Sequence, residues 1–169
     1  MGFRRRGSGV AIVAVAAALG AMLAAAGALA TTSPTQTPES YAAQVEPVCK
    51  ANTKANERIL ANVRGYIKQG KLKLAGTQFL KASEAFGKAV KQIAAVPQPT
   101  ADAAKLEKWL GYLDDQTKLL AETGKALKAG KKTRAQEQIV RLRNNANLAN
   151  NTVLSFEFRY CKIEQSRFT

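Results

Sequence analysis

The two cysteines, Cys49 and Cys161, are the residues of this chain with the clearest capacity for chemistry. Two thiols can form a disulfide, hold a soft metal ion or act as a redox pair. The sequence has no Cys-x-x-Cys motif and no histidine, so the metal and redox interpretations lack their usual partners. We therefore predict a Cys49–Cys161 disulfide, which is typical of a protein exported to an oxidising compartment.

The absence of histidine also bears on catalysis, because histidine is the commonest general base and metal ligand. The sequence contains no nucleophile elbow, phosphate-binding loop, dinucleotide fingerprint or zinc motif. Asp114 and Asp115 form an acidic pair, but no partners stand at ligand spacing from them. We expect no enzymatic activity, no metal and no cofactor.

Basic residues gather around two predicted helix-to-helix turns, at Gly70 and Gly130. If neighbouring helices are antiparallel, both turns lie at one end of the fold, which we call the basic pole. This end is either a docking face for a polyanion or a solvated end whose lysines offset the helix macrodipoles. The candidate anion-binding residues are Lys68, Lys71, Lys73, Lys125, Lys128, Lys131, Lys132 and Arg134.

Asparagines form the third group of chemical interest. Asn52 and Asn56 occupy the apolar face of the first helical pattern, and Asn145 belongs to an asparagine-rich run in the last one. These three amides could line a polar pocket between the first and last helices. The alternative is a network of amides that fixes the register of the helices, because a buried amide needs a hydrogen-bond partner.

Four helical patterns must position these residues, over ranges 39–67, 72–96, 101–129 and 133–160. Pro47 is expected to kink the first helix or to split a short segment from it. Thr100 is a predicted N-cap of the third helix, and Thr133 with Gln136 predicts a capping box for the fourth. Gly130 is placed to end the third helix.

Short connections make neighbouring helices antiparallel, so we expect an all-α, up-down-up-down four-helix bundle over residues 39–169. In that topology the start of the first helix and the end of the last lie at the same pole. Cys49 and Cys161 stand near those two ends, and a disulfide between them would close the bundle.

The N-terminus indicates export. Residues 1–30 combine three arginines, an apolar run and the small residues Ala28 and Ala30, a pattern typical of a cleaved signal peptide. We predict cleavage near Ala30 and a flexible spacer over residues 31–38, which places the protein outside the cytoplasm. An uncleaved membrane anchor is the alternative, because an apolar run of about 20 residues can span a bilayer.

The charge of the chain points to a polyanion as partner. The whole sequence has a net charge of +14; its 26 basic residues less the three arginines of the signal leave 23 against 12 acidic residues, a net +11. Anionic lipid at a membrane surface and anionic envelope polymers are the expected partners, and a protein partner is also compatible. We do not expect nucleic acid, because the protein is exported and no aromatic residues interleave with the lysines. The sequence does not define an oligomeric state.

Several segments resemble a loose class of exported helical proteins of high-GC bacteria. The resemblance rests on the alanine-rich signal, Cys49–Asn52, the segment KWLGYL at 108–113, the turn at 127–130, and the Asn/Ala-rich last helix that closes on Cys161. It implies an exported bundle with a cysteine pair and supplies no activity. We expect a non-catalytic binding or structural protein of the cell envelope; the alternative is a carrier of a small polar ligand.

Overall fold

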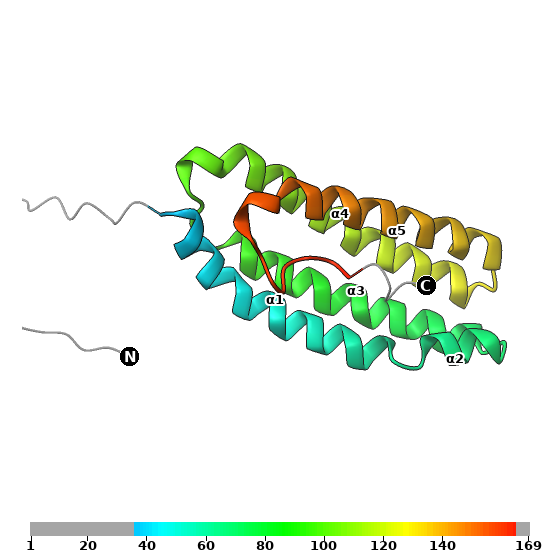
Figure 1. Cartoon of the computed structure of the whole chain (residues 1–169). Coiled ribbons are helices and arrows are strands. Elements are labelled where there is room, and N and C mark those ends of the chain that lie inside the picture. The colour runs from blue at the N-terminus through cyan, green and yellow to red at the C-terminus, as the bar shows by residue number, and fades with distance from the viewer. Residues whose placement is uncertain (1–35, 165–169) are drawn as a thin grey trace, which may run out of the picture. The chain divides into compact units, whose positions relative to one another are not determined.

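The computed structural model describes residues 36–164, and these are helical with no strand among them (Figure 1). This confirms the predicted all-α class. The predicted signal peptide at 1–30 and most of the spacer lie outside the described residues. The helices are α1 (Pro38–Leu60), α2 (Val63–Lys68), α3 (Leu72–Ala94), α4 (Ala103–Lys128) and α5 (Lys132–Thr152), with 3-10 turns at Thr100–Asp102 and Leu154–Phe156. None of the helices within 36–164 has the length and apolar character needed to cross a bilayer.

The first helix continues through Pro47 and breaks later, at positions 61–62. The alternative that Pro47 splits off a short segment is therefore wrong. A proline deprives the carbonyl four residues earlier of its partner. Here Pro47 and Ala43 are both exposed, so water can reach that carbonyl. Thr37 caps α1 through a reciprocal pair of hydrogen bonds with Ser40, at 3.2 and 3.0 Å, so the helix begins at the end of the predicted spacer.

The starts of α4 and α5 differ from the prediction. The N-cap of α4 is Asp102, because Thr100 begins a 3-10 turn instead. The N-cap of α5 is Lys131, which places Thr133 inside the helix, so the predicted capping box with Gln136 does not form. Neither helix has a side-chain hydrogen bond at its N-cap.

The last helix is shorter than predicted. It ends at Thr152, and the chain then leaves it through the 3-10 turn and Glu157, whose φ of 51° is left-handed. Figure 1 shows this C-terminal segment running from the end of α5 towards α1. Helix α1 packs on α3, α3 on α4, and α4 on α5. We call residues 157–164 the strap.

The strap is fastened to α1 and α5 by covalent and polar contacts. The predicted disulfide is confirmed, with Cys49 of α1 joined to Cys161 of the strap. The Glu46 carboxylate accepts hydrogen bonds from the backbone N–H groups of Arg159 and Tyr160, at 2.7 and 3.0 Å. On the other side, the Asn150 amide bonds both the N–H and the carbonyl of Ile163, at 2.8 and 3.1 Å. The side chains of Glu46 and Asn150 therefore satisfy backbone hydrogen-bonding groups of the strap, as the backbone of a neighbouring strand would in a sheet.

The core has two apolar clusters. One lies beside the disulfide and contains Tyr41, Trp109, Phe156 and Phe158; the other contains Phe79, Leu120, Leu127 and Leu142, nearer the glycine turns. Trp109 is completely buried and packs on Phe158, with ring centroids 5.3 Å apart. Its role in the core accounts for its place on the apolar stripe of α4.

Candidate functional site

Two turns of the same construction form the basic pole. At Gly70 the N–H bonds the carbonyl of Ile67 and the next N–H bonds that of Tyr66; at Gly130 the partners are Leu127 and Ala126. Both glycines have positive φ, 70° and 71°, which closes the helix in a Schellman motif. The predicted role of Gly130 is confirmed.

Close packing of α3 on α4 positions the two turns. Gly76 and Gly124 face each other across the helices: a methyl group on Gly76 would lie 2.5 Å from the Gly124 carbonyl oxygen. It would also lie 2.7 Å from Cγ of Lys128, so the stem of this lysine runs against α3. The approach of the two backbones holds the turn after α4 beside the start of α3.

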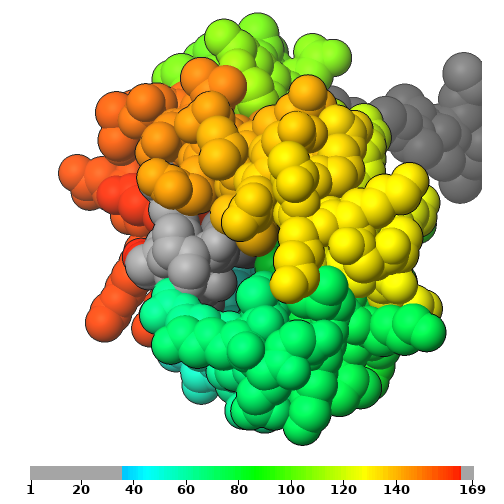
Figure 2. All heavy atoms as spheres, turned by 90° about the vertical axis from the view of Figure 1, so that its right-hand side faces the viewer, coloured from blue at the N-terminus to red at the C-terminus, as the bar shows by residue number. Residues whose placement is uncertain are grey.

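The eight predicted basic residues all lie exposed near these two turns. Figure 2 looks onto this end of the helical unit, where the segments around both turns are visible. Of these eight residues, Arg134 forms an ion pair with Glu137, at 3.3 Å. Both side chains are about half exposed, so this pair neutralises little of the local charge.

The helix C-termini at the basic pole do not explain all of these charges. Lys68, Lys125 and Lys128 lie in the last turns of α2 and α4, where a cation is favourable. Lys71 and Lys131 each lie between the end of one helix and the start of the next, where dipoles of opposite sign meet. The remaining three stand in the first turns of α3 and α5, where the macrodipole disfavours a cation. Those starts have no acidic residue in the first turn and no side-chain cap. The three cations in these first turns are Lys73, Lys132 and Arg134.

The opposite end of the fold follows the usual rule. Helix α1 begins with the Thr37–Ser40 cap and Glu39 in its first turn. Hydrogen bonds to the carboxylate, first from the backbone of Glu39 itself and then from the Thr37 hydroxyl, hold the pKa of Glu39 below its ordinary value. Asp102 stands at the start of α4 and pairs with Lys105 at 2.8 Å. Acidic helix starts are thus present at one end and replaced by basic ones at the other.

A shallow hollow of about 300 Å³ lies on the basic pole, between the end of α4 and the start of α5. Lys125, Lys131 and Arg134 line it, together with the carboxylate of Glu122. Buried Gln138 connects two of these groups: with its amide nitrogen towards Glu122, it donates to that carboxylate at 3.1 Å and accepts from Arg134 at 3.1 Å. This bridge holds the guanidinium in place at the edge of the hollow.

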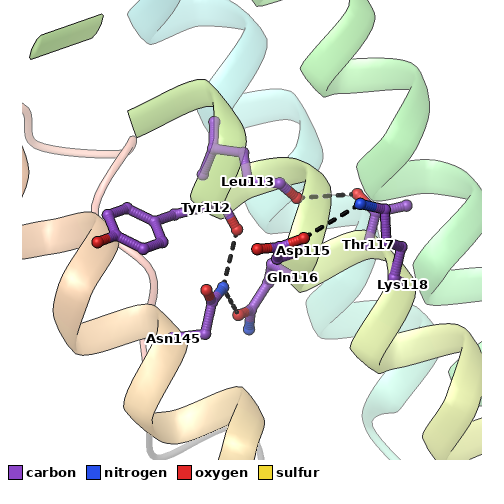
Figure 3. Close-up of polar contacts among 7 residues, drawn as sticks. All are labelled: Tyr112, Leu113, Asp115, Gln116, Thr117, Lys118 and Asn145. Atoms are coloured by element: carbon purple, nitrogen blue, oxygen red, sulfur yellow. Dashed lines mark hydrogen bonds and ion pairs between the residues drawn. The ribbon is translucent and has the colours of Figure 1, made fainter. Parts of the chain in front are cut away.

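The three predicted pocket asparagines do not come together. Asn56 donates to Asn52 at 2.9 Å, and this pair lies on α1. Asn145 instead donates to the Tyr112 carbonyl at 2.8 Å and to Gln116 Oε1 at 2.7 Å, both on α4 (Figure 3). The predicted grouping of Asn145 with the other two is therefore wrong. Its amide ties α5 to α4, as the alternative of an interhelical network predicts.

A cavity of about 60 Å³ does exist beside Asn52 and Asn56. Its other walls come from α3, α4 and the strap and are mostly apolar. Sequence reasoning missed the strap and Trp109 as parts of this cavity. It also missed Ile67 and Leu74, which are 36% and 49% exposed beside the lysines of the first turn. Two leucines within the segment KLKL after Gly70 were the available signal for an apolar patch there.

Comparisons with known proteins give this chain no relative: no family model, curated protein or solved structure matches it. Among residues 36–164, no group of three or more acidic or cysteine side chains has the proximity that a metal site requires.

Proposed function

We propose that the chain is an exported, non-catalytic binding protein of the cell envelope whose basic pole docks on an anionic lipid surface. The proposal includes an up-down-up-down order of the four long helices, with both glycine turns at one pole and the cysteine pair near the other. Export is supported by the signal-like residues 1–30 and by the disulfide, which requires an oxidising compartment.

The observation that carries the proposal is the placement of three cations, Lys73, Lys132 and Arg134, in the first turns of α3 and α5. Each cation near a helix N-terminus is disfavoured by about 0.3–1 kcal/mol. Solubility alone would be served equally well by lysines elsewhere on the surface. An anionic partner reverses the sign of this effect, because helix N-termini and lysines then attract the same ligand.

Two exposed apolar side chains favour lipid over a soluble polymer. Ile67 and Leu74 stand on either side of the first turn, close in sequence to Lys68 and Lys73. A polymer of phosphates would need only the charges. A bilayer also accepts apolar side chains below its headgroups, which adds a contribution that salt does not screen.

Co-sedimentation with vesicles tests this function. The exported protein should bind vesicles of phosphatidylcholine with phosphatidylglycerol at low salt, and should bind phosphatidylcholine alone weakly. The variant Lys128→Glu/Lys131→Glu/Lys132→Glu should bind at least ~100-fold more weakly, since each lysine near an anionic surface contributes about 1 kcal/mol. The control variant is Lys54→Glu/Lys81→Glu/Lys108→Glu, which changes the net charge by the same amount. If it loses as much vesicle affinity, binding depends on net charge alone and the basic pole is not the docking site.

A second pair of variants separates lipid from polymer. Ile67→Ser/Leu74→Ser should weaken vesicle binding at high salt and leave binding to a purified anionic envelope polymer unchanged. Val140→Ser/Leu148→Ser is the matched control, because these side chains are 53% and 50% exposed on α5. If the protein sediments with polymer but not with anionic vesicles, the lipid assignment is wrong.

A further inference from the structure

The hollow at the basic pole is lined by cations from three places in the chain and by one carboxylate. Lys125 comes from the end of α4, Lys131 from the turn and Arg134 from the start of α5. Glu122 adds the carboxylate, so three positive charges against one negative charge leave a net +2 among the lining residues. An anion is therefore the favoured occupant, with a hydrogen-bond acceptor beside it.

The backbone around the hollow also favours an anion. At the end of α4 the carbonyl groups of Lys125, Ala126 and Leu127 accept hydrogen bonds from the N–H groups of residues 129–131, at 2.9 to 3.0 Å. The start of α5 has no side-chain cap, so the positive end of this helix is open to a ligand. The carbonyl groups that would repel an anion are thus paired, whereas the helix start that attracts one is not capped.

The contacts of Arg134 leave part of its guanidinium for a ligand. The oxygen of buried Gln138 accepts from Nε and Nη2 of Arg134, at 3.1 Å each, and Nη1 donates to Glu137 at 3.3 Å. A guanidinium has five N–H donors, so one donor on Nη1 and one on Nη2 remain after these contacts. Donors on these neighbouring nitrogens fit two oxygens of one phosphate, a bidentate arrangement that a lysine cannot reproduce.

The size and charge of the hollow indicate a phosphate on a short polyol. Its volume of about 300 Å³ is twice that of a cavity of about 150 Å³ that accommodates benzene, so a group larger than a bare phosphate fits. Hydroxyl groups can donate to Glu122, because an ionised carboxylate only accepts. An ammonium group on the same headgroup would approach Lys125 and Lys131, and juxtaposed like charges disfavour binding.

We propose that the hollow binds one headgroup of phosphatidylglycerol. Arg134, Lys125 and Lys131 contact the phosphate, and Glu122 accepts hydrogen bonds from the glycerol hydroxyls. Gln138 is a positioning residue, because its amide holds the guanidinium on one side and the carboxylate on the other. This inference rests on the proposed function, since it names the lipid that the basic pole selects.

Soluble headgroup fragments test the site without a membrane. In heteronuclear NMR spectra at low salt, glycerol phosphate should shift the backbone amides of residues 131–134 saturably, with a Kd on the order of 1 mM. Methyl phosphate has the same phosphate and no hydroxyl, and should bind about fivefold more weakly. In Glu122→Ala the two probes should bind equally. Equal binding to the unchanged protein would overturn the polyol assignment, and the absence of any saturable shift would refute the site.

Vesicles of equal surface charge test the choice of lipid. Phosphatidylglycerol and phosphatidylserine each carry one net negative charge, but the second has an ammonium group. The exported protein should bind vesicles with phosphatidylglycerol about tenfold more tightly. Arg134→Lys keeps the charge but loses the bidentate donors, and Gln138→Leu keeps every charge but loses the bridge, so each should abolish this preference. Arg143→Lys, exposed further along α5, is the matched control and should retain it.

The outcomes separate this inference from the proposed function. Equal, strong binding of the unchanged protein to both lipids would refute the headgroup site and leave the basic pole as the docking surface. A saturable shift with glycerol phosphate but no binding to either vesicle would refute both the proposed function and the lipid assignment. Circular dichroism checks that each variant is folded, and leucine at buried Gln138 has a similar size. A preference retained in both Arg134→Lys and Gln138→Leu would overturn the assigned phosphate contact.

Discussion

Replacing Gly76 with alanine tests how closely α3 and α4 must approach to form the basic pole. The added methyl group would lie 2.5 Å from the Gly124 carbonyl oxygen and 2.8 Å from the Lys128 nitrogen. Both are backbone atoms of α4, so a side-chain rotation cannot relieve the overlap. The two helices must move apart, and their neighbouring side chains lose contact.

The matched control is Gly111→Ala on α4. Gly111 is exposed, and a methyl group there would meet nothing within 4 Å. Alanine is favoured over glycine inside a helix by about 1 kcal/mol, so this variant should be about 1 kcal/mol more stable. At Gly76 the same gain is opposed by overpacking, which costs about 1–3 kcal/mol or more, and by the lost interhelical contacts. We expect a net loss of ~2 kcal/mol.

Urea denaturation followed by far-UV circular dichroism measures both variants. The expected order of the free energies of unfolding is Gly111→Ala, then the unchanged protein, then Gly76→Ala. The first and last should differ by about 3 kcal/mol, from the two effects above. If Gly76→Ala is as stable as Gly111→Ala, the close α3–α4 approach does not constrain this fold, and the argument for how the two turns are positioned fails.

Further predictions concern buried and charged groups. The buried Tyr41 hydroxyl has no hydrogen-bond partner among residues 36–164, and burial raises its pKa to about 12. Tyr41→Phe should be ~1 kcal/mol more stable than the unchanged protein at neutral pH, because it removes an unpaired buried hydroxyl. Between pH 10 and 12 the unfolded chain releases the tyrosine proton before the folded protein does, so the unchanged protein should lose up to about 1.4 kcal/mol of stability per pH unit, and Tyr41→Phe should not show this loss. Cys49→Ala/Cys161→Ala opens a loop of 112 residues and should lower the free energy of unfolding by about 4–5 kcal/mol in urea titrations; a loss below ~1 kcal/mol would contradict the loop-closure argument. Lys73→Glu should raise the melting temperature, because it places an acid at a helix start, whereas Lys125→Glu at a helix end should lower it; shifts of the same sign would refute the macrodipole reading.

The sequence was sufficient to predict helix positions where backbone chemistry ends a helix locally. Gly70 and Gly130 end α2 and α4 because a left-handed residue there closes the Schellman hydrogen bonds. The two cysteines were predicted to pair from compartment and topology, and they do. At Pro47 the prediction left a kink or a split open, and only the split is wrong, because the penalty of a proline depends on whether the carbonyl it deprives of a partner is solvated.

The strap could not be predicted from the same local signals. Val153 and Phe156 continue the helical period beyond Thr152, so the pattern alone extends α5 too far. What stabilises the extended backbone instead is tertiary: the carboxylate of Glu46 and the amide of Asn150 pair its backbone groups from two different helices. The partner of Asn145 was missed for the same reason, since periodicity gives the buried face of a helix but not the neighbour it contacts.

The two ends of the fold differ in how their helices are capped and in the charge that they carry. The disulfide end has the capped start of α1, an aromatic cluster and a carboxylate that holds the strap. The basic pole has uncapped helix starts and like charges, although acidic or capping residues at Lys73 or Lys132 would satisfy the local rules. Local rules are broken in natural proteins chiefly where function requires it. Each cation in the first turn of a helix costs about 0.3–1 kcal/mol of stability, and these costs are concentrated at the basic pole. This asymmetry is the reason why we propose the basic pole as the surface that meets an anionic partner.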